Sequence, residues 1–395
     1  MSSFLARGNY IDDELSSGRR NEMNEKLQAA IAKSEDIDSR SEDSLVNPTT
    51  ISVIPRESGH KLDIEFGGRR VAVTHERMLR AVSGHAEVPF AYLEKLLNRD
   101  PELAARNLES GFRERVSDTL VRIYTDSSGE ETLRGIRTET YLPISSTLVL
   151  RRVDELFGND GGVSIEHVAL DQFGMRVTGR TKRDGTETVG SLFPGFAVGN
   201  DETGGMALEA SIRLFRLACT NGLVLPAGEG FGYRKVHAGK SSQQEIVERL
   251  FGVGTFDFGN QLKNAMPRID RALKCKVDFN SFAHGVRRRG MVTSDELGQW
   301  VDAYDHEVSE GVGRPMEALQ NTLWGSVNGL TRTARDTRDY GRAAVLERTA
   351  GALLSLSDRQ VETMASLGRA YIHEVQTAGG KRAENLRLAL STGLN

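Results

Sequence analysis

The chain has 395 residues, of which 38% are hydrophobic and 27% are charged, and its formal net charge is −4. A chain of this length and composition is expected to fold as a globular protein of two or three domains. No apolar run approaches the roughly 18 residues that span a bilayer, and two cysteines, Cys219 and Cys275, exclude a disulfide framework and a cysteine-rich zinc site.

The N-terminal segment, residues 1–45, is polar and holds ten acidic and six basic side chains. Only the stretch from Asn24 to Lys33 has helical character. A segment with so little apolar surface gains little by folding, so we expect a flexible acidic arm. Met1 to Tyr10 show no apolar stretch behind a basic start, so we expect no secretory signal and a cytoplasmic location.

Strand patterns begin after this arm. Apolar residues alternate at Ile51–Ile54 and Leu62–Phe66, and Gly67-Gly68 is typical of a hairpin turn into Val71–Val73. Helices are expected at Thr74–Val82, at Pro89–Val116 with a break at Asp100-Pro101, and at Ser146–Phe157. Further strands are expected at Leu120–Tyr124, Thr132–Ile136, Val163–Val168, Gly174–Thr178, Val189–Val198, Ala207–Leu217, Leu223–Leu225 and Tyr233–His237.

After Ser241 apolar residues recur at three- and four-residue spacing, which predicts helices. The expected helices are Gln243–Leu250, Asn260–Cys275, Ser294–Val308, Pro315–Trp324, Tyr340–Leu356 and Asp358–Gln376. The sequence therefore predicts an α+β fold. A mainly antiparallel, β-rich core with flanking helices is expected over residues 46–240, and a helical C-terminal region over residues 241–395.

The centre of the chain carries a recognisable pair of motifs. Asn200-Asp-Glu-Thr-Gly204 precedes the run Arg216-Leu-Ala-Cys-Thr-Asn-Gly222. Together they resemble the phage- and plasmid-like family catalogued as domain of unknown function 932, although Asp201 stands where serine is usual. Flanking stretches at Arg137–Ile144 and Trp324–Thr331 extend the resemblance over roughly residues 117–354. The resemblance implies a protein of phages, prophages or plasmids, acting in a bacterial cell, and implies no particular reaction.

Two of these features could carry enzymatic chemistry. Cys219 could be a nucleophile with His237 as its base, but a cysteine after an apolar run is more often buried, and Asn221-Gly222 is typical of a tight turn. The acidic residues Asp201 and Glu202 could hold a divalent metal ion or form a solvated loop. Both alternatives stay open at this stage.

The segment after the last expected strand has features of a phosphate site. Ala238–Ser242 resembles the end of a phosphate-binding loop, but Arg234 stands where that motif requires its first glycine. Ser242 and Glu245 predict a capping box at the start of a helix, whose backbone N–H groups and dipole attract anions. A plain capped helix is the alternative.

Positive charge gathers in the same part of the chain, where Ser211 to Arg289 contains fourteen Lys and Arg against six Asp and Glu. Such an excess favours a polyanionic partner, although charges spread over solvated helix faces would give the same count. Four aromatic residues accompany the cations, as in proteins that bind single strands, but each could equally lie in the core: Phe231, Tyr233, Phe279 and Phe282.

These observations favour a non-enzymatic, nucleic-acid-binding protein, with single-stranded DNA as the expected partner in replication or recombination of a phage or plasmid. The expected phosphate contacts are Arg213, Arg216, Arg234, Lys235, Lys240, Arg287, Arg288 and Arg289. The second hypothesis is a structural or regulatory protein-interaction module, such as an antagonist of host defence. The third is an enzyme that uses Cys219 or a metal at Asp201 and Glu202. We expect no cofactor and no membrane partner, and a homo-oligomer is compatible with the sequence.

Overall fold

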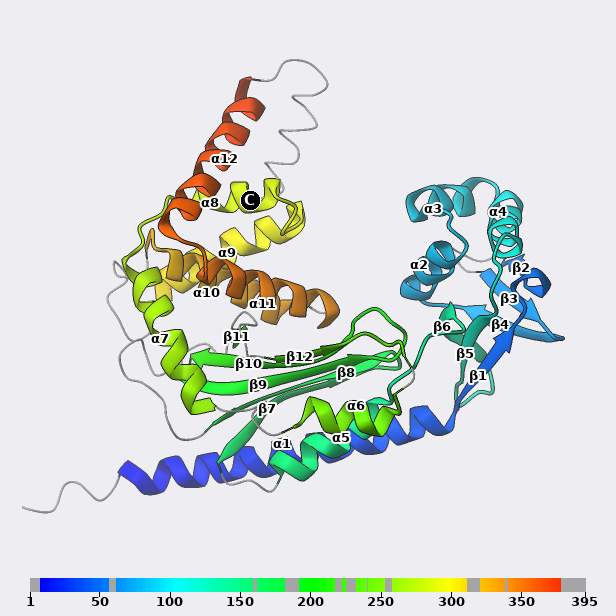
Figure 1. The fold of residues 1–395 in the computed structure, drawn as a ribbon, viewed down its shortest axis with the longest axis horizontal. Helices are drawn as coiled ribbons and strands as arrows, with labels where there is room; N and C mark the ends of the chain where they lie inside the picture. Colours follow the sequence, from blue (N-terminus) through cyan, green and yellow to red (C-terminus); the bar gives the residue numbers. More distant parts are fainter. Residues whose placement is uncertain are drawn as a thin grey trace, which may run out of the picture.

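The computed structural model of the chain describes residues 8–56, 62–158, 162–181, 192–216, 222–224, 232–239, 241–252, 258–310, 320–337 and 340–377. Within these ranges the chain forms two six-stranded sheets with helices packed against them, and a helical C-terminal region (Figure 1). The predicted α+β class, with mainly antiparallel strands and a helical C-terminal region, is confirmed.

The first sheet has the strand order β1-β5-β6-β4-β3-β2. Its strands are β1 (Ser41–Val46), β2 (Ser52–Pro55), β3 (Leu62–Phe66), β4 (Arg69–Val73), β5 (Thr119–Thr125) and β6 (Glu131–Thr138). Neighbouring strands are antiparallel except for β4 and β6. The apolar stripes of α2 (Glu76–His85), α3 (Phe90–Arg99) and α4 (Pro101–Arg113) bury the core of this sheet.

Two local predictions in this part are confirmed at the level of the backbone. Gly67 and Gly68 both have positive φ angles, 55° and 78°, and join β3 to β4 as a hairpin. Asp100 separates α3 from α4, and its side chain accepts a hydrogen bond of 2.9 Å from the backbone N–H of Leu103. Pro101 then occupies the first turn of α4, where a missing N–H costs nothing.

The second sheet has the order β11-β10-β9-β8-β7, and β12 also pairs with β10. Its antiparallel strands are β7 (Val163–Leu170), β8 (Gly174–Thr181), β9 (Leu192–Asp201), β10 (Leu208–Arg216), β11 (Gly222–Val224) and β12 (Gly232–Lys235). Figure 1 shows one face against α1 (Gly8–Ser39), α5 (Ser146–Val153) and α6 (Gln243–Leu250). Residues Asp154–Gly158 continue α5 as a short π-helical turn. On the other face lie α7 (Phe258–Lys274), α10 (Leu323–Asp336) and α11 (Tyr340–Leu354).

The N-terminal segment, predicted to be a flexible arm, is ordered as a helix and a strand from residue 8 on. Residues 8–39 form one helix, and β1 follows it directly and pairs with β5. Leu27 and Ile31 are buried in the core of the second sheet, and Ile37 is also buried. The prediction failed because widely spaced apolar residues on one helix face are enough for packing when a sheet supplies the other half of the core.

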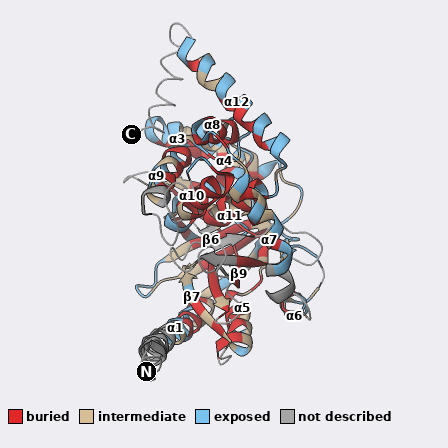
Figure 2. Cartoon of the chain, turned by 90° about the vertical axis from the view of Figure 1, so that its left-hand side faces the viewer, coloured by how far each residue is buried: buried red, intermediate tan, exposed pale blue. Residues whose placement is uncertain are grey.

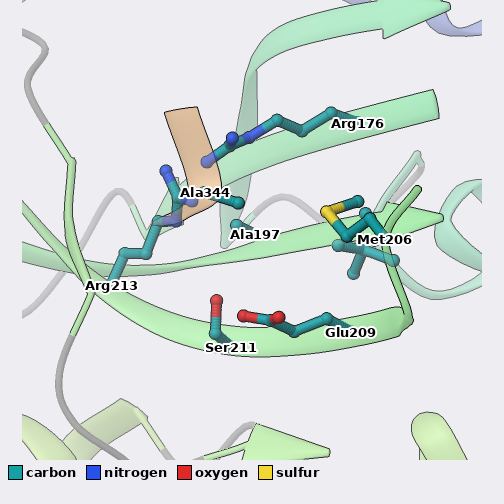
Figure 3. Close-up of a pocket in the computed structure, with 9 residues that line it drawn as sticks. Arg176, Ala197, Met206, Glu209, Ser211, Arg213 and Ala344 are labelled. Carbon is teal, nitrogen blue, oxygen red and sulfur yellow. The ribbon is translucent and has the colours of Figure 1, made fainter. Parts of the chain in front are cut away.

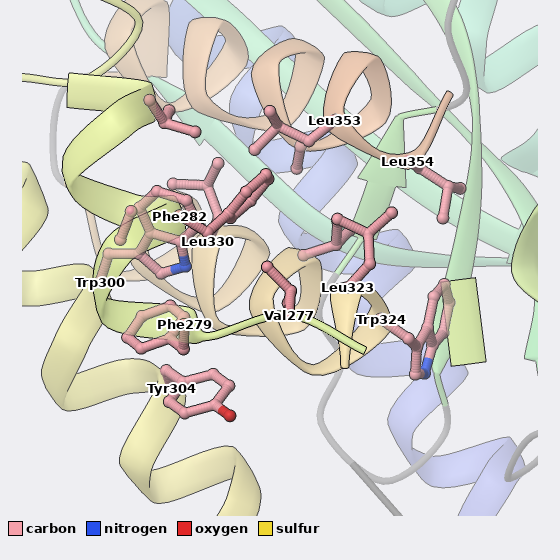
Figure 4. Close-up of a cluster of buried hydrophobic side chains, with 14 of the residues drawn as sticks. Val277, Phe279, Phe282, Trp300, Tyr304, Leu323, Trp324, Leu330, Leu353 and Leu354 are labelled. Atoms are coloured by element: carbon pink, nitrogen blue, oxygen red, sulfur yellow. The ribbon is translucent and has the colours of Figure 1, made fainter. Parts of the chain in front are cut away.

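The boundary predicted at residue 240 also differs from the structure. α6 packs into the core of the second sheet together with α5 and α1, so the β-rich unit extends past it. The later helices α8 (Phe279–Arg288), α9 (Ser294–Glu310) and α12 (Asp358–Thr377) form the outer part of the C-terminal region. They share one core with α10 and α11, built around Phe282, Trp300 and Leu330 (Figure 4).

Two helices of this region differ from the prediction. Most of the helix expected at Pro315–Trp324 lies outside the described ranges, and α10, which begins at Leu323 behind the capping side chain of Thr322, overlaps that prediction by only two residues. α8 was not predicted at all. Both helices contain glycines, which weaken a helical pattern. In Figure 2 α10 and α11 are mostly buried, whereas α12 exposes much of its surface.

In the described part of the chain, no helix combines the length and the apolar character needed to cross a membrane.

The imidazole of His85 couples the stability of the first sheet to pH. Its Nε2 lies 2.9 Å from the Thr119 hydroxyl, and burial lowers the pKa of His85 to about 4, with the charges of Arg115 and Arg137 adding to the effect. In the unfolded chain the pKa of this histidine is near 6.5. Between about pH 6.5 and pH 4, His85 is therefore protonated in the unfolded chain and neutral in the folded chain.

We therefore expect stability to be full above pH 6.5 and to fall as the pH decreases toward 4, with His85 contributing a loss of about 1 to 2 kcal/mol by pH 5. Urea unfolding at pH 7 and pH 5 measures this loss. His85→Gln cannot gain the proton, so its loss between the two pH values should be smaller by that amount. An unchanged loss in the variant would show that His85 is not the titrating group.

Candidate anion-binding cleft

The motif at the end of β9 lies in the interior. Asn200, Asp201 and Glu202 are at most 1% exposed, so the solvated loop considered for them is wrong. Asp201 forms an ion pair with Arg77 of α2, and its Oδ1 accepts hydrogen bonds of 2.9 and 2.7 Å from the backbone and hydroxyl of Thr203. The guanidinium of Arg77 and the Thr203 donors thus supply the polar partners that a buried carboxylate needs.

Glu202 joins the two sheets. Its Oε2 accepts hydrogen bonds from Arg134 of β6, at 2.9 Å, and from Arg122 of β5, at 3.4 Å. Its Oε1 accepts one of 2.7 Å from the backbone N–H of Ser146, at the start of α5. The carboxylates of Asp201 and Glu202 are thus engaged by arginines, and the described ranges contain no group of three or more His, Cys, Asp or Glu residues that could hold a metal ion.

Beside this network lies a cleft of about 480 Å³. Its walls come from four parts of the chain: the end of β6 with the segment that follows it, the turn between β9 and β10 with the start of β10, the end of β12 with the residues that follow it, and the helix α11. The lining residues are Arg137, Tyr141, Gly204, Gly205, Met206, Ala207, Glu209, Arg234, Val236, His237, Gly341, Val345 and Arg348. Three of these side chains are arginines and one is a carboxylate.

Arg137 is the least compensated of these arginines. It is half-buried, and among the described residues no side chain forms a hydrogen bond or an ion pair with it. Burial lowers the pKa of its guanidinium, while Tyr141, whose ring centroid lies 6.0 Å away, opposes that shift. A half-buried cation without a carboxylate is costly unless an anion binds to it.

The backbone of Gly204-Gly205 gives the arginines room. Gly204 has a φ of +84°, and a Cβ at this position would overlap the guanidinium of Arg137. A Cβ on Gly205 would overlap Arg77 and the carboxylate of Asp201. Two guanidiniums therefore lie directly against this turn, and one of them, Arg77, is paired with Asp201.

The outer wall holds the other two arginines. Arg234 is exposed on β12, directly opposite Glu209 in the pairing with β10. Arg348 reaches from α11 to the same carboxylate, with 2.5 Å between its Nη1 and Oε2 of Glu209. Glu209 thus holds Arg348 in place and neutralises about one of the three positive charges.

His237 adds no charge at neutral pH. Its ring is 3% exposed and stacks on Tyr141, with 5.3 Å between the ring centroids. Burial lowers the pKa of His237 to about 4, although its hydrogen bond with the carbonyl of Leu142 opposes the shift. The imidazole is therefore neutral at pH 7 and serves to position Tyr141.

The part of the chain that forms the cleft matches a known protein family. The domain of unknown function described as DUF932 matches residues 134–366, which is well over half of the chain. The chain belongs to this family. No curated protein and no solved structure matches it. All thirteen residues that line the cleft fall inside the DUF932 domain.

Arg213, one of the expected phosphate contacts, is instead buried in an ion-pair network. In the DUF932 domain it is 4% exposed, and both it and Arg176 of β8 form ion pairs with Glu347 of α11. Figure 3 shows the two guanidiniums pointing toward α11 beside Ala344. Burial lowers the pKa of Arg213 to about 10, so it remains charged and bound to Glu347. The sequence could not show that this face of β10 would be covered by a helix over 130 residues away.

One other expected contact, Arg234, lines the cleft, and Lys235 follows it on β12. The backbone of Arg216 ends β10, where it pairs with Leu192, and Lys240 lies outside the described residues. The structure thus brings Arg234 of the predicted set to the cleft.

The three consecutive arginines expected as phosphate contacts, Arg287, Arg288 and Arg289, belong to the end of α8, and the first two contact α12. Arg287 donates hydrogen bonds to the hydroxyls of Ser294 and Tyr371, and Arg288 pairs with Glu374 at 3.2 Å. Arg287 and Arg288 complete the last turn of α8 and Arg289 caps it, where positive charge is favourable beside the free carbonyls. The position of these arginines at the C-terminal end of α8, and the partners of Arg287 and Arg288, explain their presence without a bound anion.

The aromatic residues that were expected to stack on the bases of single-stranded DNA are mostly core residues. Phe279 and Phe282 are 7% and 0% exposed in the C-terminal core, and Tyr233 packs against the core of the second sheet. Phe231 lies outside the described residues. Among the described members of this set, none offers a platform on which bases could stack.

The capping box of α6 is confirmed. Ser242 Oγ accepts a hydrogen bond of 3.2 Å from the backbone N–H of Glu245, and the Glu245 carboxylate accepts one of 3.2 Å from the N–H of Ser242. Two of the N–H groups proposed for a phosphate are therefore already satisfied by the helix itself.

The tight turn predicted at Asn221-Gly222 is wrong for Gly222, which lies in a strand. β10 and β11 do form an antiparallel hairpin, but Gly222 is part of β11 and pairs with Phe215. Residues 216–221 connect the paired positions, so Asn221-Gly222 is not a two-residue turn. Cys219 and Asn221 lie outside the described residues, and the hypothesis of a Cys219 nucleophile stays a hypothesis.

Sequence reasoning missed three residues of the cleft: Arg137, Tyr141 and Arg348. A signal existed for the first two, since both lie in the stretch Arg137–Ile144 that resembles the family. The motif at Asn200–Gly204 is the second such stretch, and it packs against the first. For Arg348 no local signal existed, because only the packing of α11 brings it to the cleft.

Proposed function

We propose that this protein binds nucleic acid through phosphate groups that enter the cleft. The observation that carries the proposal is Arg137, a half-buried guanidinium that has no carboxylate partner among the described residues and opens into a cleft with two further arginines. Arginine is well suited to phosphate because its planar fork can donate two hydrogen bonds at once.

Binding of this kind is independent of base sequence. Phosphate contacts position a strand without reading it, and the described aromatic residues expected to stack on bases are mostly buried. We further propose single-stranded DNA as the partner, in replication or recombination of a phage or plasmid, on the strength of the family resemblance. A protein-interaction module and an enzyme that uses Cys219 are the alternatives.

A titration with labelled single-stranded DNA, duplex DNA and RNA at two salt concentrations tests the proposal. We expect the logarithm of the association constant for single-stranded DNA to fall linearly with the logarithm of the salt concentration, with a slope of about −0.7 for each phosphate contacted. Arg137→Gln should lower the affinity about tenfold or more, because a charge-assisted hydrogen bond in a half-buried site is lost. Arg234→Gln should lower it less, because Arg234 is exposed.

The matched control is Arg369→Gln on α12, an exposed arginine paired with Glu362, which should change the affinity less than about twofold. Circular dichroism should show all three variants folded. If wild type and Arg137→Gln bind every nucleic acid equally poorly at low salt, the protein-interaction alternative becomes the better hypothesis.

A further inference from the structure

We infer that the cleft is a site for a terminal phosphomonoester, supplied either by the end of a nucleic-acid strand or by a free nucleotide, and not for the phosphodiesters within a strand. The strand as a source rests on the proposed function. The phosphomonoester as the bound group rests on the charge, the size and the lining of the cleft.

The charge of the lining matches a dianion. Arg137, Arg234 and Arg348 contribute three positive charges, and Glu209 removes one. His237 is neutral at pH 7, because its pKa lies near 4. The net charge of about +2 equals that of a phosphomonoester at neutral pH, which carries roughly −1.5 to −2, whereas a phosphodiester carries one negative charge.

The size of the cleft is also compatible with an end group. A volume of about 480 Å³ lies within the range of small-ligand sites. The Arg77–Asp201 ion pair lies against the Gly204-Gly205 turn that lines the cleft. A single phosphate group with its attached sugar fits a space of this size.

The lining offers little to a base. The ring of Tyr141 stacks on His237 and lies beside Arg137, so its position is explained by holding these two side chains. The apolar side chains of the lining, Met206, Ala207, Val236 and Val345, are aliphatic and offer no ring on which a base could stack, and Val236, which is 58% exposed, could contact a sugar or the edge of a base. Recognition through the phosphate, with little base preference, follows from this composition.

The experiment compares four single-stranded DNAs of one sequence and length with an internal label: 5′-phosphorylated, 3′-phosphorylated, unphosphorylated and circular. Adenosine monophosphate and inorganic phosphate serve as competitors with the full chain. We expect one end-phosphorylated strand to bind about tenfold tighter than the unphosphorylated and circular strands, and adenosine monophosphate to compete with it. Arg137→Gln should abolish the difference, and Arg369→Gln should retain it.

Three outcomes separate the two proposals. If all four strands bind equally and Arg137→Gln weakens all of them alike, the inference is overturned and the proposed function stands. If no strand binds but adenosine monophosphate does so in an Arg137-dependent manner, the phosphomonoester site stands and the proposed function falls. Binding of neither overturns both. Should Arg137→Gln fail to fold, Arg234→Gln on the exposed strand β12 carries the same comparison.

Discussion

Replacing Glu202 by Gln is expected to lower the free energy of unfolding by about 3 to 5 kcal/mol. The carboxylate is 1% exposed and accepts hydrogen bonds from two arginines and one backbone N–H. Arg134, itself 2% exposed, would be left in the interior without its main counter-charge. Removing one partner of a buried ion pair costs more than the pair contributes, because the other charge stays desolvated.

Urea unfolding followed by circular dichroism measures this effect. The matched control is Glu76→Gln, which makes the same chemical change in an exposed i,i+4 pair with Arg80 on α2. Its effect should stay within about 0.5 kcal/mol. A loss at Glu202 no larger than that of the control would mean that the arginines find other partners or water, and that the junction of the two sheets does not depend on this residue.

Gly368→Ala is expected to destabilise the packing of α12 by about 1 to 3 kcal/mol. A Cβ at this position would overlap the carbonyl oxygen of Ser281 and crowd the backbone of Gly285, both on α8. The contact is backbone against backbone, so no side chain can move aside and the helices must separate. Since α8 is the principal neighbour of α12, the effect should concentrate on α12.

Limited proteolysis, with the thermal midpoint recorded alongside, detects this change as faster cleavage within α12. Gly84→Ala provides a control of the same chemistry, since Gly84 lies in α2 with no atom within 4 Å of the added methyl group. It should stabilise the protein by up to about 1 kcal/mol through helix propensity alone. Equal effects of the two substitutions would contradict the close helix crossing.

The candidate site shows where sequence reasoning reached its limit. Arg213 and Arg234 are both cationic residues of strands in the same sheet, yet one is buried with Glu347 and the other is exposed at the cleft. The difference arises because α11 covers part of β10 and leaves β12 open. Charge counted along the chain could therefore indicate an anion-binding region but could not select the residues that form it.

Sequence patterns within about ten residues were sufficient to predict the α+β class and three local features: the hairpin at Gly67-Gly68, the break at Asp100-Pro101 and the capping box at Ser242. Each of these depends on backbone angles and hydrogen bonds between near neighbours in the sequence. The burial of Asp201 and Glu202, the packing of α1 and the assembly of the cleft required the folded chain. Each of these joins residues far apart in sequence, such as Glu202 with Arg122 and Arg348 with Glu209, and only the packing of the sheets and helices brings their charges together.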